Sequence, residues 1–150
     1  MTDLIHVTYA QTGQSSKINH YGMREMQANA FESRNSQYLL LKAPPASGKS
    51  RALMFIALDK LINQGLKKVI VAVPERSIGG SFGDTELSKY GFFADWQPND
   101  HYNLCTPGND GSKSKVEVFK NFMANDEKIL ICTHATLRFA YEELEDNLFN

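Results

Sequence analysis

Gly48, Lys49 and Ser50 place a flexible backbone, a long cation and a hydroxyl side by side. They close the stretch 43–50, Ala-Pro-Pro-Ala-Ser-Gly-Lys-Ser, which follows the apolar run Tyr38–Leu41 and precedes a helix-patterned segment. A strand, a loop that ends in Gly-Lys-Ser and a helix are the layout of a phosphate-binding loop. Backbone N–H groups in such a loop attract anionic oxygens, and glycine lets a phosphate approach the main chain closely.

The side chains of this motif have separate predicted roles. Lys49 is expected to reach the β- and γ-phosphates of a bound nucleotide as the catalytic cation, and the Ser50 hydroxyl is expected to bind a metal ion. The cofactors predicted are therefore ATP and Mg²⁺. The alternative is an ordinary turn before a helix, with Lys49 exposed to solvent. The residues of this stretch expected to bind the nucleotide are Pro45, Ala46, Ser47, Gly48, Lys49, Ser50 and Arg51.

The composition limits the class of protein. The chain has 150 residues, 42% of them hydrophobic and 22% charged, which suits a globular domain with a core. Its net charge of -1 gives no general basic excess, so any nucleic-acid binding must use a local patch. The only cysteines, Cys105 and Cys132, are too few for a disulfide scaffold. With no signal-peptide pattern and no long apolar run, a cytoplasmic setting is expected.

Apolar runs and helical periodicity alternate along the chain. The alternation predicts an α/β fold with a mainly parallel sheet, whose ligand-binding loops lie at the carboxyl ends of the strands. The loops at 43–50, 74–81 and 132–136 are therefore expected on one surface. The strands predicted are a short edge strand carrying Leu4 to Tyr9, then 37–43, 67–74, 102–105 and 128–132. Those at 37–43 and 128–132 are expected to be buried, and the one at 67–74 is expected to be covered on both faces. The helices predicted are 22–34, 51–64, a broken helix in 76–90 with its better part at 84–90, one opened by Ser114, and 135–145.

Three further motifs stand in a fixed order around the phosphate loop. Arg24 and Gln27 form an R-x-x-Q pair before it, Val71–Ser77 reads VAVPERS after the next strand, and Ile129–Leu137 reads ILICTHATL after a later one. With residues 43–50, these resemble the first motifs of superfamily 2 helicases and translocases, over residues 22–140. Within that family the chain is most similar to the motor subunits of type I and type III restriction enzymes and to related bacterial DNA helicases.

The resemblance implies a RecA-like P-loop three-layer fold with a mainly parallel sheet. Residues 1–20 would be a lead-in segment, and residues 21–150 would be the first part of the ATP-binding domain. Gln27 would recognise adenine and Arg24 would support the base or the loop. The partners implied are nucleic acid, with DNA favoured, and a second RecA-like domain of the same motor. The residues implied to touch the phosphate backbone are Pro74, Arg76, Ser77, Thr133 and Thr136.

The chain departs from the family pattern at several points. Ala46 stands where many members have glycine, and Glu75 stands where a threonine is usual. The resemblance also requires an acidic Asp-Glu motif after a further strand, whereas the acids after His134 lie in a polar, helix-patterned stretch. The chain alone is therefore expected to be inactive. Its strands at Tyr38–Leu41 and Val69–Val73 would lack their family neighbours, so they would pair directly or be completed by a second copy in a homodimer.

Two other function classes and a metal site are the alternatives to this interpretation. A P-loop nucleotide kinase would carry a lid with several arginines, and a nucleotide-sensing module would bind ATP without nucleic acid. A zinc site would need two histidines and two cysteines to converge. The candidate residues, His101, Cys105, Cys132 and His134, have spacings that match no common zinc pattern.

Overall fold

A computed structural model describes residues 4–8, 19–106 and 112–143 of the chain. Two compact units are present, and each is described by itself. Unit 1 comprises Met1–Gly65 with Thr85–Trp96, and unit 2 comprises Leu66–Asp84 with Gln97–Asn150. The chain therefore passes from one unit to the other at three points. In the described residues, no helix is long and apolar enough to cross a membrane.

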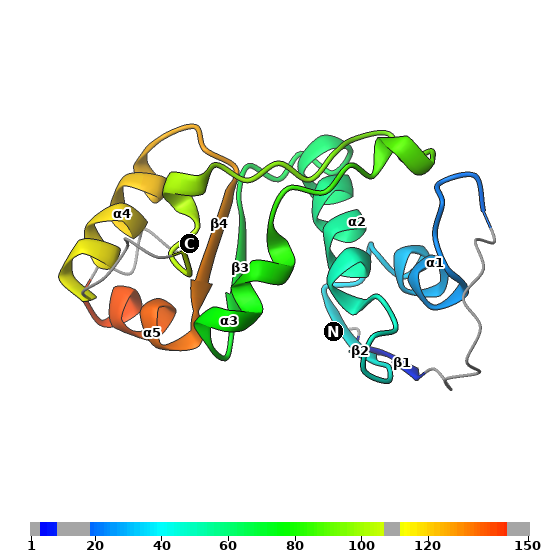
Figure 1. Cartoon of the computed structure of the whole chain (residues 1–150), viewed down its shortest axis with the longest axis horizontal. Coiled ribbons are helices and arrows are strands. Elements are labelled where there is room, and N and C mark those ends of the chain that lie inside the picture. Colours follow the sequence, from blue (N-terminus) through cyan, green and yellow to red (C-terminus); the bar gives the residue numbers. More distant parts are fainter. Residues whose placement is uncertain (1–3, 9–18, 107–111, 144–150) are drawn as a thin grey trace. The chain divides into compact units, whose positions relative to one another are not determined.

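Unit 1 is built on a parallel pair of strands and two helices. The strands are β1 (Leu4–Thr8) and β2 (Tyr38–Lys42), paired in register from Leu4 with Tyr38 to Thr8 with Lys42. Parallel neighbours need a crossover connection, and α1 (Glu25–Glu32) lies within it. The phosphate-loop stretch joins β2 directly to α2 (Lys49–Ile62), which runs alongside α1 (Figure 1).

Helix α1 forms with the apolar face that its periodicity predicts. The backbone N–H of Arg24 donates to the side-chain Oε1 of Gln27 over 2.8 Å, which satisfies a donor at the helix start. The four residues expected on the buried face, Met23, Met26, Ala30 and Phe31, are all at most 6% exposed. An eight-residue helix has little stability alone, so this packing is what holds it in place.

An aromatic cluster fills the core of unit 1. The rings of Phe55 and Phe92 lie 4.7 Å apart between centroids, and Phe31 and Tyr21 contact Phe92 edge-on. Phe92 belongs to the segment 85–96, whose ends are joined by two backbone hydrogen bonds between Thr85 and Trp96. Burying aromatic rings is strongly stabilising, so this returning segment is an integral part of unit 1.

The helix predicted for residues 84–90 is wrong. Only the single 3₁₀ turn η2 (Ser88–Tyr90) forms there, because the backbone of Thr85 bonds to Trp96 instead of to a helical neighbour. The helical part of this region begins earlier, with α3 (Arg76–Gly79) and the 3₁₀ turn η1 (Gly80–Phe82). A pairing with a later residue has therefore overridden local helical propensity.

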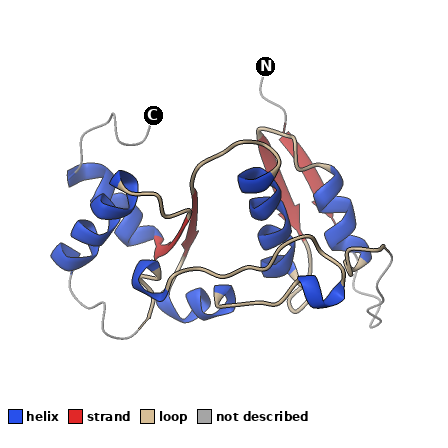
Figure 2. Cartoon of the chain, turned by 90° about the horizontal axis from the view of Figure 1, so that it is seen from above, coloured by secondary structure: helices blue, strands red, loops and turns tan. Residues whose placement is uncertain are grey.

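Unit 2 is a second parallel pair of strands with helices against it. β3 (Val69–Val73) pairs with β4 (Ile129–Thr133), side by side in Figures 1 and 2. The connection carries η3 (Asp100–Tyr102) and α4 (Ser112–Ala124), and β4 leads into α5 (His134–Glu143). The core residues between the strands and these helices include Leu104, Phe119, Phe122, Leu130, Cys132 and Ala140.

Lys68 fastens the end of α4 to the start of β3. Its ammonium donates to the carbonyls of Phe122, Asn125 and Glu127 at 2.7, 2.6 and 2.8 Å. The last carbonyls of a helix lack partners within the helix, so a cation placed there satisfies them and favours the negative end of the helix dipole. The helix itself begins at Ser112, before the Ser114 start that the sequence suggests.

The structure confirms an α/β chain with parallel strand pairs, although burial differs from the prediction. β4 is buried from Ile129 to Cys132 and half-buried at Thr133, whereas β2 alternates, with Tyr38 49% and Leu40 50% exposed. β3 is half-buried over most of its length and fully buried only at Val73. The alternation in β2 means that one face of this strand is open among the described residues, so β2 is not the buried strand that its apolar run predicts.

Two further strand predictions need correction. The strand predicted at 102–105 is reduced to one bridge, between Asn103 and Ile131. In the described residues β2 pairs with β1 and β3 with β4, in separate two-stranded sheets, so the direct pairing considered for β2 and β3 does not occur. Of the other predictions, Tyr9 in the edge strand and residues 144–145 of the last helix lie outside the described residues.

Candidate nucleotide and nucleic-acid sites

The phosphate-loop stretch turns sharply before α2. Gly48 is the residue that precedes the helix, and its φ of 92° is in the left-handed region that glycine adopts readily. Ala46 has a φ of 61°, and it is the one non-glycine residue with positive φ in the described part of the chain. An alanine held in this conformation costs about 1–2 kcal/mol. The departure from glycine at position 46 thus leaves the loop geometry in place and adds strain to it.

Lys49 lies back across the loop. Its Nζ donates to the main-chain carbonyl of Ala43, the first residue of the motif, over 2.8 Å. The Ser47 hydroxyl donates to the carbonyl of Pro44 over 2.6 Å. Both hydrogen bonds join residues within the loop and so stabilise the turn. The Lys49 ammonium has three N–H donors, and the bond to Ala43 uses one of them.

The R-x-x-Q pair lies against the phosphate loop. Gln27, only 2% exposed, donates from Nε2 to the carbonyl of Gly48 over 3.1 Å. A Cβ added at Gly48 would lie 2.5 Å from that Nε2 and 3.7 Å from Nη1 of Arg24. A side chain at position 48 would therefore displace Gln27, which gives this glycine a packing role as well as a conformational one.

The remaining predicted nucleotide residues lie in the same unit. Ser50 is half-buried in the first turn of α2, and Pro45 is exposed on the loop. The Arg51 guanidinium lies 5.9 Å from the centre of the Tyr90 ring. Sequence reasoning missed Tyr90, because only the fold brings the segment 85–96 to this helix. Gly22 gives a partial signal in hindsight, since it has a φ of 75° and a Cβ there would contact Tyr90.

The residues implied to touch nucleic acid lie together in unit 2. Val73 and Thr133 are register partners at the carboxyl ends of β3 and β4, so the segments that follow both strands begin at one sheet edge. Pro74, Arg76 and Ser77 follow β3 and are exposed. Arg76 donates from Nη2 to the carbonyl of Thr106 over 3.0 Å.

Thr133 and Thr136 open helix α5. The Thr133 hydroxyl oxygen accepts from the backbone N–H of Thr136 over 3.2 Å, the bond that a helix-capping threonine makes. The two hydroxyl oxygens lie 3.2 Å apart, and Thr136 is 7% exposed, while Thr133 is half-buried. Thr133 is therefore the more exposed of the two residues.

The cysteines of unit 2 are buried thiols. Desolvation raises the pKa of Cys132 from 9.0 to about 12, and it also raises the pKa of Cys105, where Lys115 and Arg76 oppose the shift. A thiol binds metal as thiolate, which both shifts disfavour. His101 and His134 are exposed. No group of three or more His, Cys, Asp or Glu side chains suited to a metal ion was found in the part of the chain that the structure describes.

Comparison with known proteins gives one strong similarity. The chain is 63% identical over 150 residues to a protein of Bacillus subtilis (strain 168) named "Putative ATP-dependent helicase YeeB". The similarity covers the whole of this chain, which spans only 24% of the relative's length. No family model and no solved structure matches the chain. Superfamily 2, the RecA-like fold and the likeness to restriction enzymes stay predictions.

Proposed function

We propose that this chain is an ATP-binding part of a superfamily 2 helicase or translocase, with a RecA-like fold. The observation that carries the proposal is the hydrogen bond from Gln27 to Gly48, because it joins the adenine motif to the phosphate loop. The identity of 63% to a protein named as a helicase supports the same function.

In this proposal the nucleotide phosphates bind at the start of α2. The backbone N–H groups at the first turn of a helix carry a partial positive charge, and Lys49 adds a full one. On phosphate binding, Lys49 would exchange its bond to the Ala43 carbonyl for bonds to phosphate oxygens. A charge-assisted bond to phosphate is stronger than one to a neutral carbonyl, so the exchange is favourable.

Adenine recognition falls to Gln27. Its amide already accepts from the Arg24 backbone and donates to Gly48, and it keeps a second N–H and a second lone pair. Those two groups match the N7 acceptor and N6 donor of adenine. Guanine offers acceptors at both equivalent positions, so adenine nucleotides should bind more tightly than guanine nucleotides.

Ser50 is the residue here that would hold Mg²⁺. Its hydroxyl is the hard oxygen ligand that Mg²⁺ prefers, and this ion usually takes few protein ligands, with phosphate oxygens and waters completing its shell. The donor chemistry of the site therefore fits the ion. Bound there, Mg²⁺ would neutralise phosphate charge.

Unit 2 would provide contacts to a nucleic-acid strand. The exposed Arg76 and Ser77 and the half-buried Thr133 offer a cation and hydroxyls at one sheet edge. Such groups bind phosphates without reading bases, as a motor that moves along any sequence requires. DNA is the nucleic acid favoured.

The relative is much longer than this chain, which spans 24% of it. We infer that the catalytic acid and the second motor domain belong to the remaining part of such a longer protein.

A homodimer of the chain is also proposed, since Tyr38 and Leu40 expose an apolar strand face. Light scattering tests the dimer.

Calorimetric titration with ADP, GDP and pyrophosphate tests the nucleotide site, and tighter binding of ADP than of GDP is expected.

A further inference from the structure

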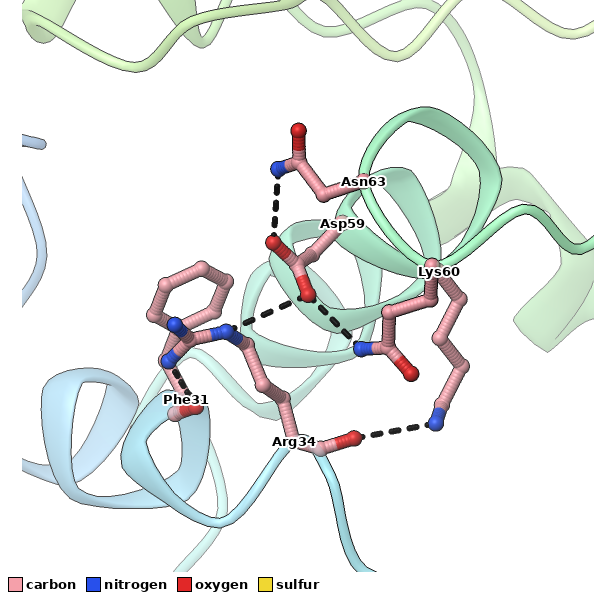
Figure 3. Close-up of polar contacts among 6 residues, drawn as sticks. Phe31, Arg34, Asp59, Lys60 and Asn63 are labelled. Atoms are coloured by element: carbon pink, nitrogen blue, oxygen red, sulfur yellow. Dashed lines mark hydrogen bonds and ion pairs between the residues drawn. The ribbon is translucent and has the colours of Figure 1, made fainter.

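Arg34 and Asp59 form an ion pair in unit 1, towards the end of α2 that is distant from Gly48. Arg34 Nε lies 3.2 Å from Asp59 Oδ2, and the side chains are 34% and 6% exposed (Figure 3). The carboxylate also accepts from Asn63 Nδ2 over 2.8 Å and from Gln64 Nε2 over 2.7 Å. A buried carboxylate is costly without partners, and this one has three.

Further contacts fix Arg34 itself. Its Nη1 donates to the carbonyl of Phe31 over 3.1 Å, and its guanidinium lies 4.3 Å from the centre of the Phe31 ring. The Lys60 ammonium donates to the Arg34 carbonyl over 2.9 Å. Arg34 thus connects the last turn of α1 to the last turn of α2 through both its side chain and its backbone, as Figure 3 shows.

Helix α1 is consequently joined to α2 by polar contacts at two levels. Gln27 meets Gly48 at the start of α2, and Arg34 meets Asp59 and Lys60 near its end. At 1.5 Å per residue, the two levels are separated by about 16 Å along α2. Two polar attachments that far apart add to the apolar packing of α1 in fixing the tilt of this short helix, whereas one attachment would constrain the tilt less.

We propose that the Arg34–Asp59 pair positions Gln27 for base recognition. Neither residue would touch the nucleotide. By holding the far end of α1, the pair would keep the Gln27 amide against Gly48 and aimed at the base. Only the part of this proposal that concerns base recognition rests on the proposed nucleotide function. A functional group keeps its productive geometry only when supporting residues hold it there.

The test variant is Arg34→Met. Methionine keeps an apolar stem near the Phe31 ring and removes the charge and the donors, while Asn63 and Gln64 still serve the Asp59 carboxylate. Arg34→Lys restores the charge without the planar fork and should give an intermediate effect. Arg138→Met is the matched control, since Arg138 is 82% exposed and lies in unit 2.

The first readout needs no nucleotide. In NMR spectra of the full 150-residue chain, the side-chain amide signal of Gln27 reports its hydrogen bond to Gly48. The expected result is a shift toward the free-amide position in Arg34→Met, a smaller shift in Arg34→Lys and none in Arg138→Met. An unmoved Gln27 signal in a folded Arg34→Met protein would overturn the proposal.

The second readout is titration with ADP, GDP and pyrophosphate. Arg34→Met should weaken ADP binding roughly two- to tenfold, the value of about one hydrogen bond, and leave pyrophosphate binding unchanged. In a Gln27→Ala background the same change should no longer alter the ratio of ADP to GDP affinity. Equal losses of affinity for all three ligands would overturn the proposal, because they would indicate a general loosening of the site. If the unmodified chain bound no nucleotide, the proposed function would fail, while the Gln27 signal would still decide the positioning role.

Discussion

The side-chain amide of Gln27 donates to the main-chain carbonyl of Gly48 over 3.1 Å, across 21 positions of sequence. The same carbonyl accepts from the backbone N–H of Ala52 over 3.0 Å, in the first turn of α2. Gly48 therefore links the adenine motif, the phosphate loop and the helix that follows. Any change at Gly48 should affect both the stability of unit 1 and base recognition.

Gly48→Ala tests that linkage against Gly65→Ala. Both glycines have positive φ, but a Cβ at Gly65 meets nothing within 4 Å, whereas one at Gly48 meets Gln27. Gly65→Ala should lower the free energy of unfolding by about 1–2 kcal/mol for the backbone alone. Gly48→Ala should cost about 1 kcal/mol more, for the lost hydrogen bond. Urea unfolding measures both, and equal losses would contradict a role for Gln27 in holding the loop.

Arg76→Gln tests the proposed nucleic-acid surface. Affinity for single-stranded DNA should fall by a similar factor for every sequence, and the salt dependence should weaken by about one phosphate contact. Fluorescence anisotropy with oligonucleotides of different sequence measures this. Lys120→Gln is the control, because Lys120 is exposed on α4 close to where β4 begins, away from the carboxyl ends of the strands. A loss confined to one sequence would argue for base reading instead.

Cys132 should make stability fall at alkaline pH. Burial raises its pKa from 9.0 to about 12, so between these values the unfolded chain loses a proton that the folded chain keeps. The contribution of the protonated Cys132 thiol to the free energy of unfolding is complete below pH 9. Above pH 9 it declines by at most about 1.4 kcal/mol per pH unit. The stability difference between the unmodified chain and Cys132→Ala should therefore shrink from pH 9 upward in urea titrations. A constant difference would show that the thiol ionises equally in both states.

The 150-residue chain alone should hydrolyse ATP no faster than background, with or without DNA. An arginine finger by itself contributes roughly 10³–10⁵ in rate, and in the proposed function it comes from another domain. Phosphate release by the purified chain measures this. Robust turnover would mean that a catalytic acid had been missed, and Glu86→Gln and Glu142→Gln would be the variants to examine first.

Local features of the structure could be predicted from the sequence. The helix after Gly48, the buried face of α1 and the buried strand Ile129–Thr133 all follow from periodicity and from glycine at a turn. These features depend on neighbours within a few residues, which a sequence pattern records directly. The parallel pairing also follows, because the strands alternate with helices.

Features that depend on distant partners were not predictable. Nothing local marks Thr85 as a partner of Trp96, so residues 84–90 were expected to be helical. The apolar run in β2 predicts a buried strand, although Tyr38 and Leu40 are half exposed. For the candidate site, the sequence motifs identify Gln27 and Lys49. The hydrogen bonds that hold these side chains to Gly48 and to Ala43 depend on the fold.

The affinity of Lys49→Ala for ADP tests the central claim most directly. Lys49 is the cation of the proposed phosphate site, and a charge-assisted hydrogen bond contributes about 1.5–3 kcal/mol, so affinity should fall at least about tenfold. Lys67→Ala removes the same charge from an exposed position in unit 2 and should bind ADP as the unmodified chain does. Circular dichroism and urea unfolding should show both variants folded. Unchanged ADP affinity in a folded Lys49→Ala protein would contradict the assignment of residues 43–50 as a phosphate-binding loop.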